Sequence, residues 1–226
     1  MAICVAATGL GAMPQSPAAK NGRRPVLKEV LARMDNTAGR LKTLSATLEY
    51  TVVTALVDDK STEMGKIFYR KGPQVLIEFS APSERKFFFG GDRAEVYYPK
   101  INQLQEYKLE NHQGMIEQFL LLGFGTNSSR LRKSYHLKMV REEVLDGDAV
   151  VVLELIPKDE EVRERLKKVI LWISEESWLP VQQKFSKPGG DYTVAKYSSV
   201  KVNRALSASR LKIKTKKDTT RVRMNN

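Results

Sequence analysis

The sequence predicts a mainly β protein (α+β) in which a curved antiparallel sheet of about eleven strands carries helices on its concave face. Three features support this prediction. A helical pattern opens after residue 25, alternation of apolar and polar residues dominates from residue 46 to residue 202, and an apolar helical segment interrupts it around residue 115. The composition, 42% hydrophobic and 28% charged residues, is typical of a globular chain, and no apolar run reaches the roughly 18 residues that a membrane span needs.

The first helix is predicted over residues 26–43. Pro25 favours the start of a helix because its fixed φ is already helical. The apolar residues that follow fall on one stripe, which consists of Leu27, Val30, Leu31, Met34, Ala38 and Leu41. Charged residues occupy the opposite side, so we expect the apolar stripe to pack against the sheet.

Period-two alternation predicts the strands. Their ranges are 46–52, 63–70, 75–79, 85–89, 93–98, 103–109, 134–141, 149–156, 166–173, 178–186 and 191–202. Turns of a few residues join most of them, whereas a parallel connection needs a dozen residues or more, so the predicted sheet is an antiparallel meander. A sheet of this size curls, and it either closes into a barrel or wraps around the helices.

The second helical segment is predicted over residues 111–123, with a further turn over 128–133. Its apolar face consists of Met115, Ile116, Phe119 and Leu122. Core packing explains such a face, but Gly114 and Gly123 at its two ends permit hinge rotation, which favours a movable lid.

Most of the net charge of +12 lies near the C-terminus. Residues 196–226 hold ten Lys or Arg and one acidic residue. A nucleic-acid-binding surface would interleave such charge with stacking aromatic residues, and this region offers only Tyr197. We therefore expect no nucleic-acid partner and interpret residues 216–226 as a basic, disordered tail.

The first residues are typical of a secretory signal. Residues 1–13 form a short apolar run with small residues, and a polar, proline-rich stretch follows. Because the usual basic start is missing, either a signal over residues 1–20 with a truncated start or a disordered leader explains the pattern. The signal is the favoured interpretation, and it predicts export to the periplasm.

Catalytic and metal-binding patterns are absent from the sequence. The single cysteine, Cys4, lies in the leader, and the two histidines, His112 and His136, do not form an HExxH pair. No GxSxG, GxGxxG or P-loop motif occurs. We therefore expect no catalytic residues, no metal site and no cofactor.

Two runs of residues occur in a characteristic order along the predicted strands. The first is Gly65-Lys66-Ile67-Phe68-Tyr69-Arg70-Lys71-Gly72-Pro73, followed by Ile77, Phe79, Pro82, Gly91, Tyr98-Pro99 and Gln103. The second comprises Gly123-Phe124-Gly125, Tyr135, Gly147, residues 153–157, Trp172-Ile173, Trp178-Leu179-Pro180, Gly190-Asp191-Tyr192 and Val202-Asn203. In order and spacing, residues 26–215 resemble the LolA-like family of periplasmic outer-membrane lipoprotein carriers and lipoprotein-sorting proteins.

The resemblance implies a single half-barrel domain, an unclosed antiparallel β-barrel whose helices cover an apolar cavity for lipoprotein acyl chains. It also implies an inner-membrane release complex and an outer-membrane acceptor as partners. In the family, a basic residue, usually arginine, bonds to the lid, and Lys71 takes that position here. An ammonium replaces a planar guanidinium, so the lid is expected to be held more loosely. Gly72 and Gly90 also depart from the family pattern.

The candidate ligand-binding residues lie in the predicted cavity wall and lid. They are Val75, Ile77, Phe79, Phe87, Phe89, Met115, Ile116, Phe119 and Leu122, with Lys71 as the lid latch. Plain core packing is the alternative explanation for the wall. The predicted function is a non-catalytic, monomeric periplasmic carrier of acylated lipoproteins. Two alternatives stay open: a periplasmic sensor of lipid or mislocalised lipoprotein on the same fold, and a small hydrolase on a lipid-binding fold.

Overall fold

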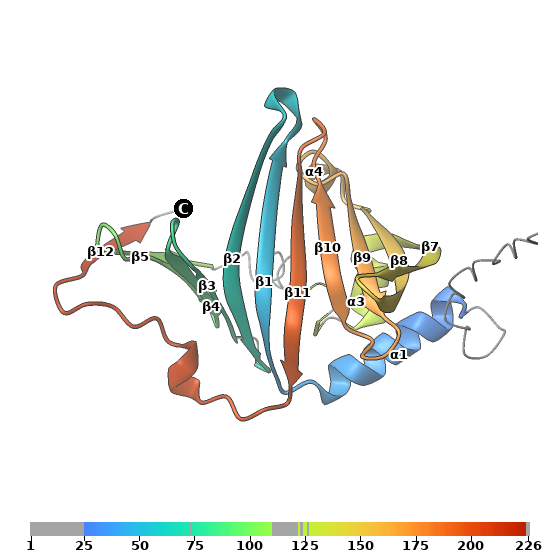
Figure 1. Cartoon of the computed structure of the whole chain (residues 1–226), viewed down its shortest axis with the longest axis horizontal. Coiled ribbons are helices and arrows are strands. Elements are labelled where there is room, and N and C mark those ends of the chain that lie inside the picture. Colours follow the sequence, from blue (N-terminus) through green and yellow to red (C-terminus); the bar gives the residue numbers. More distant parts are fainter. Residues whose placement is uncertain (1–24, 73, 110–121, 123, 126, 225–226) are drawn as a thin grey trace, which may run out of the picture.

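The computed structural model describes residues 25–72, 74–109, 122, 124–125 and 127–224. These residues form one twelve-stranded sheet, which curves without closing, together with short helices (Figure 1). The helices are α1 (Leu27–Arg40), α3 (Ser128–Ser134) and α4 (Glu160–Arg163), with single 3-10 turns at η1 (Ala55–Val57) and η2 (Ala208–Leu211). The strands are β1 (Thr43–Thr54), β2 (Asp59–Arg70), β3 (Gln74–Phe79), β4 (Arg85–Gly90), β5 (Arg93–Tyr98), β6 (Gln103–Lys108), β7 (Tyr135–Leu145), β8 (Asp148–Pro157), β9 (Lys168–Ser174), β10 (Pro180–Ser186), β11 (Tyr192–Val202) and β12 (Thr220–Met224).

Two antiparallel meanders make up the sheet. One runs from β1 to β6 and the other from β7 to β11, and they join where β1 pairs with β11. The strand order is β12-β6-β5-β4-β3-β2-β1-β11-β10-β9-β8-β7. The expected fold class and its eleven antiparallel strands are confirmed, because short turns force each strand to pair with its neighbour.

The twelfth strand was not predicted. β12 pairs in parallel with β6, and the backbone N of Thr220 donates to the carbonyl of Asn102 at 3.0 Å. Arg221 also donates to Glu106 across this pair at 2.7 Å. The expectation of a disordered tail over residues 216–226 is therefore wrong for β12, since β6 offers an unpaired edge on which the last residues can form a ladder.

The helix boundaries differ from the predicted ones for local reasons. α1 ends at Arg40 because Thr43 already pairs in β1, so the predicted end at residue 43 is too late. α4 lies between the predicted strands 149–156 and 166–173, where Asp159 caps it by accepting from the backbone N of Val162. The predicted leader (residues 1–20) and most of the predicted second helix (residues 111–123) lie outside the described residues, whereas the further turn is present as α3.

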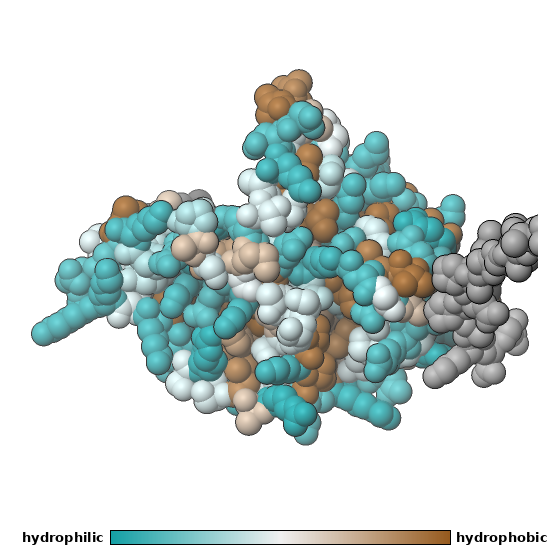
Figure 2. All heavy atoms as spheres, in the orientation of Figure 1, coloured by the Kyte–Doolittle hydropathy of each residue, from teal (hydrophilic) through white to brown (hydrophobic). Residues whose placement is uncertain are grey.

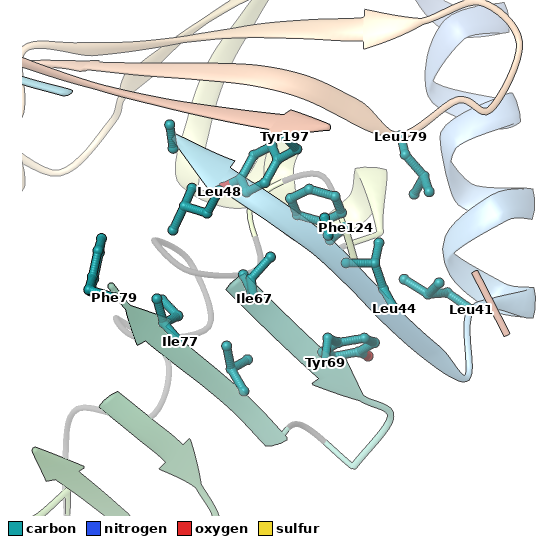
Figure 3. Close-up of a cluster of buried hydrophobic side chains, with 13 residues drawn as sticks. Leu41, Leu44, Leu48, Ile67, Tyr69, Ile77, Phe79, Phe124, Leu179 and Tyr197 are labelled. Atoms are coloured by element: carbon teal, nitrogen blue, oxygen red, sulfur yellow. The ribbon is translucent and has the colours of Figure 1, made fainter. Parts of the chain in front are cut away.

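We call the side of the sheet that α1 packs against the inner face. Over β8 and β9 this face holds a cluster that includes Val151, Leu153 and Leu171, closed by Val30 and Leu31 of α1. Over β1 to β3 it holds a second cluster that includes Leu44, Ile67, Ile77 and Phe79 (Figure 3). Among the described helices, none is both long and apolar enough to cross a membrane.

Candidate functional site

Four aromatic rings line up on the inner face of β1, β3 and β4. Tyr50 meets Phe79 at a centroid distance of 5.7 Å, Phe79 meets Phe87 at 6.0 Å, and Phe87 stacks on Phe89 at 6.5 Å. Strand alternation explains the arrangement, because the register places Phe87 opposite Ile77 and Phe89 opposite Val75, so their side chains share one face. We call Tyr50, Phe79, Phe87 and Phe89 the aromatic wall.

The aromatic wall is only partly covered. Phe79 is buried, but Tyr50, Phe87 and Phe89 are half-buried, although they pack against a cluster of buried residues. Phe88, between two wall residues, points to the outer face and is buried against Leu76. The three consecutive phenylalanines therefore divide between the two faces, as strand alternation requires. The inner rings present aromatic surface that the described residues do not fully bury.

A charged pair ends the aromatic wall. Arg85 lies on the same side of β4 as Phe87, and its guanidinium carbon stands 4.2 Å above the Phe79 ring. It donates two hydrogen bonds to Glu63, at 2.6 and 2.5 Å. These bonds from Arg85 hold the pKa of the Glu63 carboxyl below its ordinary value, and the carboxylate raises the pKa of Arg85. The face is thus apolar along its length and ionic at one end.

A buried polar network lies where the two meanders meet. Gln183, which is fully buried in β10, donates to the carbonyl of Leu122 at 2.5 Å and accepts from the hydroxyl of Tyr197 at 3.1 Å. Burial raises the pKa of that hydroxyl, which therefore stays protonated and able to donate. Phe124 packs edge-on against Tyr197 at 4.8 Å, close to Leu44 and Ile67 (Figure 3). The network fixes Leu122 and Phe124 to the sheet.

Lys71 bonds to the end of α1. Its ammonium donates to the carbonyl of Gly39 at 3.3 Å, and its backbone N donates to the carbonyl of Lys42 at 2.8 Å. Asn203 holds the same junction, since its side chain accepts from the backbone N of Lys42 and donates to the carbonyl of Arg40. Lys71 and Asn203 therefore both hold the C-terminal end of α1 against the sheet.

The predicted site residues divide into three groups. Val75, Ile77, Phe79, Phe87 and Phe89 lie together on the inner face. Leu122 is fully buried, but it lies in the other inner-face cluster, with Leu31 of α1. Met115, Ile116 and Phe119 lie outside the described residues.

Sequence reasoning missed two features of this face. The position of Arg85 on this face had a detectable signal, because Arg85, Phe87 and Phe89 follow a period of two and so share a face, whereas its partner Glu63 had none. Gln183 had none, since its role depends on where Leu122 packs. In the part of the chain that the structure describes, no three His, Cys, Asp or Glu side chains gather closely enough to hold a metal ion.

Comparison with known proteins places the chain in a fold and a family. A family model described as "Uncharacterized protein" matches residues 74–226. No curated protein sequence matches the chain. Among solved structures, an uncharacterized conserved protein from Thermus thermophilus aligns with a TM-score of 0.57 and 14% identity, covering 87% of this chain and 98% of that chain.

Two further solved structures align with the chain at similar identity. MucB aligns with a TM-score of 0.53 and 15% identity, covering 83% of this chain and 62% of that chain. A LolA superfamily protein from Nitrosomonas europaea aligns with a TM-score of 0.42 and 14% identity, covering 84% of this chain and 99% of that chain. At these identities the likenesses concern the fold alone.

Proposed function

Since this chain belongs to the family described as "Uncharacterized protein" and has a LolA-like fold, we propose that it is a non-catalytic lipid-binding carrier. The ligand is the acyl part of a lipoprotein or of another amphipathic molecule, and it lies along the inner face beside the aromatic wall. The setting is the periplasm, where a carrier passes its cargo between an inner-membrane release complex and an outer-membrane acceptor.

The half-buried aromatic wall is the observation that carries this proposal. Tyr50, Phe87 and Phe89 keep exposed ring surface next to fully packed neighbours, so an apolar guest can gain contact there. Each methylene that leaves water contributes about 0.8 kcal/mol, so a partly covered acyl chain already binds appreciably. A row of rings also suits release, because it provides contact area without hydrogen bonds that must break.

The Arg85–Glu63 pair supports an amphipathic ligand. It lies at one end of the aromatic wall, where Arg85 covers Phe79 and Phe87. A guest that lays its chain along the rings can place its polar end beside this pair without burying it.

Lys71 is proposed to regulate access to the inner face. Its bond to Gly39 ties α1 to the end of β2, and α1 is the longest described helix that packs on this face. The ammonium of Lys71 donates a single hydrogen bond to α1, whereas a guanidinium could donate two parallel ones. We therefore expect the C-terminal end of α1 to separate readily from the sheet.

Bound lipid and chain-length dependence test the proposal. The protein, exported to a bacterial periplasm and purified without detergent, should carry acyl lipid that is visible by native mass spectrometry. Affinity for a series of fluorescent fatty acids should rise up to about fourfold per methylene until the inner face is filled.

Two results would overturn the proposal. One is an empty protein that takes up no acyl probe, and the other is affinity that does not depend on chain length. If lipid is retained but never passed to acceptor vesicles, the sensor alternative replaces the carrier.

A further inference from the structure

The chain after β11 is a structured strap on the outer face of the sheet. Residues 203–219 leave the foot of β11 and cross to the opposite edge, where β12 begins (Figure 1). Leu211 anchors this stretch, with 1% of its side chain exposed, against Leu76 and Phe88 of the outer face. Leu206 and Ile213 pack beside it. The basic segment is therefore held in a fixed path.

The path turns lysines toward solvent. Ile213 and Thr215 are half-buried, whereas Lys212, Lys214 and Lys216 between and beside them are exposed. In extended chain this alternation places every second side chain on the same side, at intervals of roughly 6.5 Å. With the exposed Lys217 that follows, they form what we call the lysine row: Lys212, Lys214, Lys216 and Lys217.

The lysine row keeps its charge uncompensated. Two of the three nearby glutamates have ion-pair partners, since Glu78 pairs with Arg210 and Lys86 and Glu106 pairs with Arg221. Glu84 makes no salt bridge within the described residues, so one carboxylate stands against the four lysines. Asp218 accepts a hydrogen bond from the side chain of Asn102. Within the described ranges, no salt bridge to any lysine of the row is present. Four cations thus project from one ordered segment.

A recess lies beside the lysine row. Lys214, Thr215 and Lys216 form one side of it, and strands β3 to β5 form the other, enclosing about 550 Å³. Lys86, Tyr97, Glu78 and Glu84 are among the strand-side residues. Arg210 and Lys86 neutralise Glu78, so cations prevail at the lysine side. The recess has the size and charge to admit a phosphate-bearing headgroup.

We propose that the lysine row and its recess dock the protein on an anionic phospholipid bilayer. Lysines are compact point charges that attract phosphates without a required geometry, which suits a fluid surface. The strap and β12, residues 203–224, contain no aromatic residue, so the stacking that single-stranded nucleic acid needs is missing. They also lack the buried Trp or Tyr anchors of protein interfaces. The recess also borders Phe79 and Arg85, so the docking surface adjoins the acyl-binding face while the lysine row lies outside it.

Vesicle binding tests this proposal with a matched pair of variants. The row variant carries Lys→Gln at 212, 214, 216 and 217, and the control carries Lys→Gln at the exposed positions 28, 138, 167 and 187, so both lose the same charge. Binding of the full chain is measured by flotation with phosphatidylcholine vesicles and with two-to-one phosphatidylcholine–phosphatidylglycerol vesicles.

We expect binding to the mixed vesicles only, and a loss on the order of 100-fold in the row variant at low salt. The control should lose a few-fold at most, and salt at about 0.5 M should abolish binding. Both variants should take up acyl probe as the unchanged protein does, which also verifies folding and separates this test from that of the proposed function.

Three results would overturn the proposal. The first is equal binding to both vesicle types. The second is a loss in Leu56→Asp and not in the row variant, which would assign docking to the apolar tip of the β1–β2 hairpin, where Leu56 is 92% exposed (Figure 2). The third is a row variant that keeps vesicle binding but loses binding to single-stranded DNA, which would make the strap a nucleic-acid surface.

Discussion

The two halves of the inner face are filled in different ways. Over β8 and β9, aliphatic residues such as Val151, Leu153 and Leu171 have no exposed surface, because α1 lays Val30 and Leu31 against them. Over β1 to β4, the aromatic wall keeps three half-buried rings and ends in an ion pair. The first half is an ordinary core that stabilises the fold, and the second combines the apolar area with the incomplete cover that a guest requires.

The difference teaches that the same strand pattern serves two purposes on one sheet. Alternation places apolar residues on the inner face of both meanders, but α1 covers the aliphatic side chains over β8 and β9, whereas the rings over β1 to β4 keep part of their surface exposed. The identity of the inward residues, and the element that packs on them, decides which half is a core and which is a candidate site.

The largest expected effect lies in the helix-covered half. Leu153→Ala removes a fully buried side chain and should lower the free energy of unfolding by about 2–5 kcal/mol. Urea denaturation measures this loss, and Val144→Ala, at a site 65% exposed, serves as the control with about 0.5 kcal/mol or less. The affinity of the folded protein for the acyl probe should not change. A tenfold loss of affinity would contradict the assignment of the β8–β9 half to the core alone.

The next effect lies in the aromatic wall. Phe89→Ala removes a half-buried ring and should weaken acyl-probe binding by roughly tenfold, since about 1.4 kcal/mol of apolar contact is lost. Phe68→Ala removes a half-buried ring from the outer face and should leave binding unchanged. Equal losses in the two variants, measured by fluorescence titration, would mean that the wall is not where the probe lies.

A smaller effect is expected at the end of α1. Lys71→Leu removes the bond to Gly39, a contact worth about 1 kcal/mol, and should speed probe dissociation two- to tenfold. Asn203 still holds the junction, so thermal stability should change little. The rate of probe release is measured by stopped flow for Lys71→Leu and for the control Lys66→Leu, which changes an exposed lysine in β2. Should Lys71→Leu lower stability without changing release, Lys71 would be structural only.

The smallest effect concerns pH. Hydrogen bonds from Arg85 lower the pKa of Glu63 in the folded protein. The pair therefore stabilises the fold fully at pH values above the pKa of Glu63 in the unfolded chain, near 4.5. This stabilisation is lost as the pH falls through the lower pKa of the folded protein. Because both side chains are partly exposed, we expect only about 0.5–1 kcal/mol at neutral pH. Glu63→Gln should therefore unfold more easily than the parent protein at pH 7 and equally at about pH 3, in urea titrations.

Much of the fold could be predicted because its signals are local. The period of two and the short turns give eleven strands and their pairing, and they place Phe87 and Phe89 on one face. β12 escaped prediction because its two arginines resemble a solvated tail, whereas the strand depends on the free edge of β6, far away in sequence.

The candidate site was predictable only in part. Val75, Ile77, Phe79, Phe87 and Phe89 could be grouped by alternation, since neighbouring strands of a hairpin share their faces. The partners of Arg85 and Gln183 could not be predicted, because Glu63 lies two strands away and Leu122 lies in the segment that connects the two meanders. Long-range contacts of this kind follow from register and packing, which a single sequence does not encode in any local pattern.

Photo-crosslinking tests the central claim most directly. A fatty acid with a diazirine near its methyl end is bound, activated by light and located by peptide mass spectrometry. If the acyl chain lies along the aromatic wall, the labels will fall on peptides of β1 to β4 that carry Tyr50, Phe79, Phe87 and Phe89. Labels that fall instead on β8 and β9, or on the outer face around Leu76 and Leu211, would contradict it.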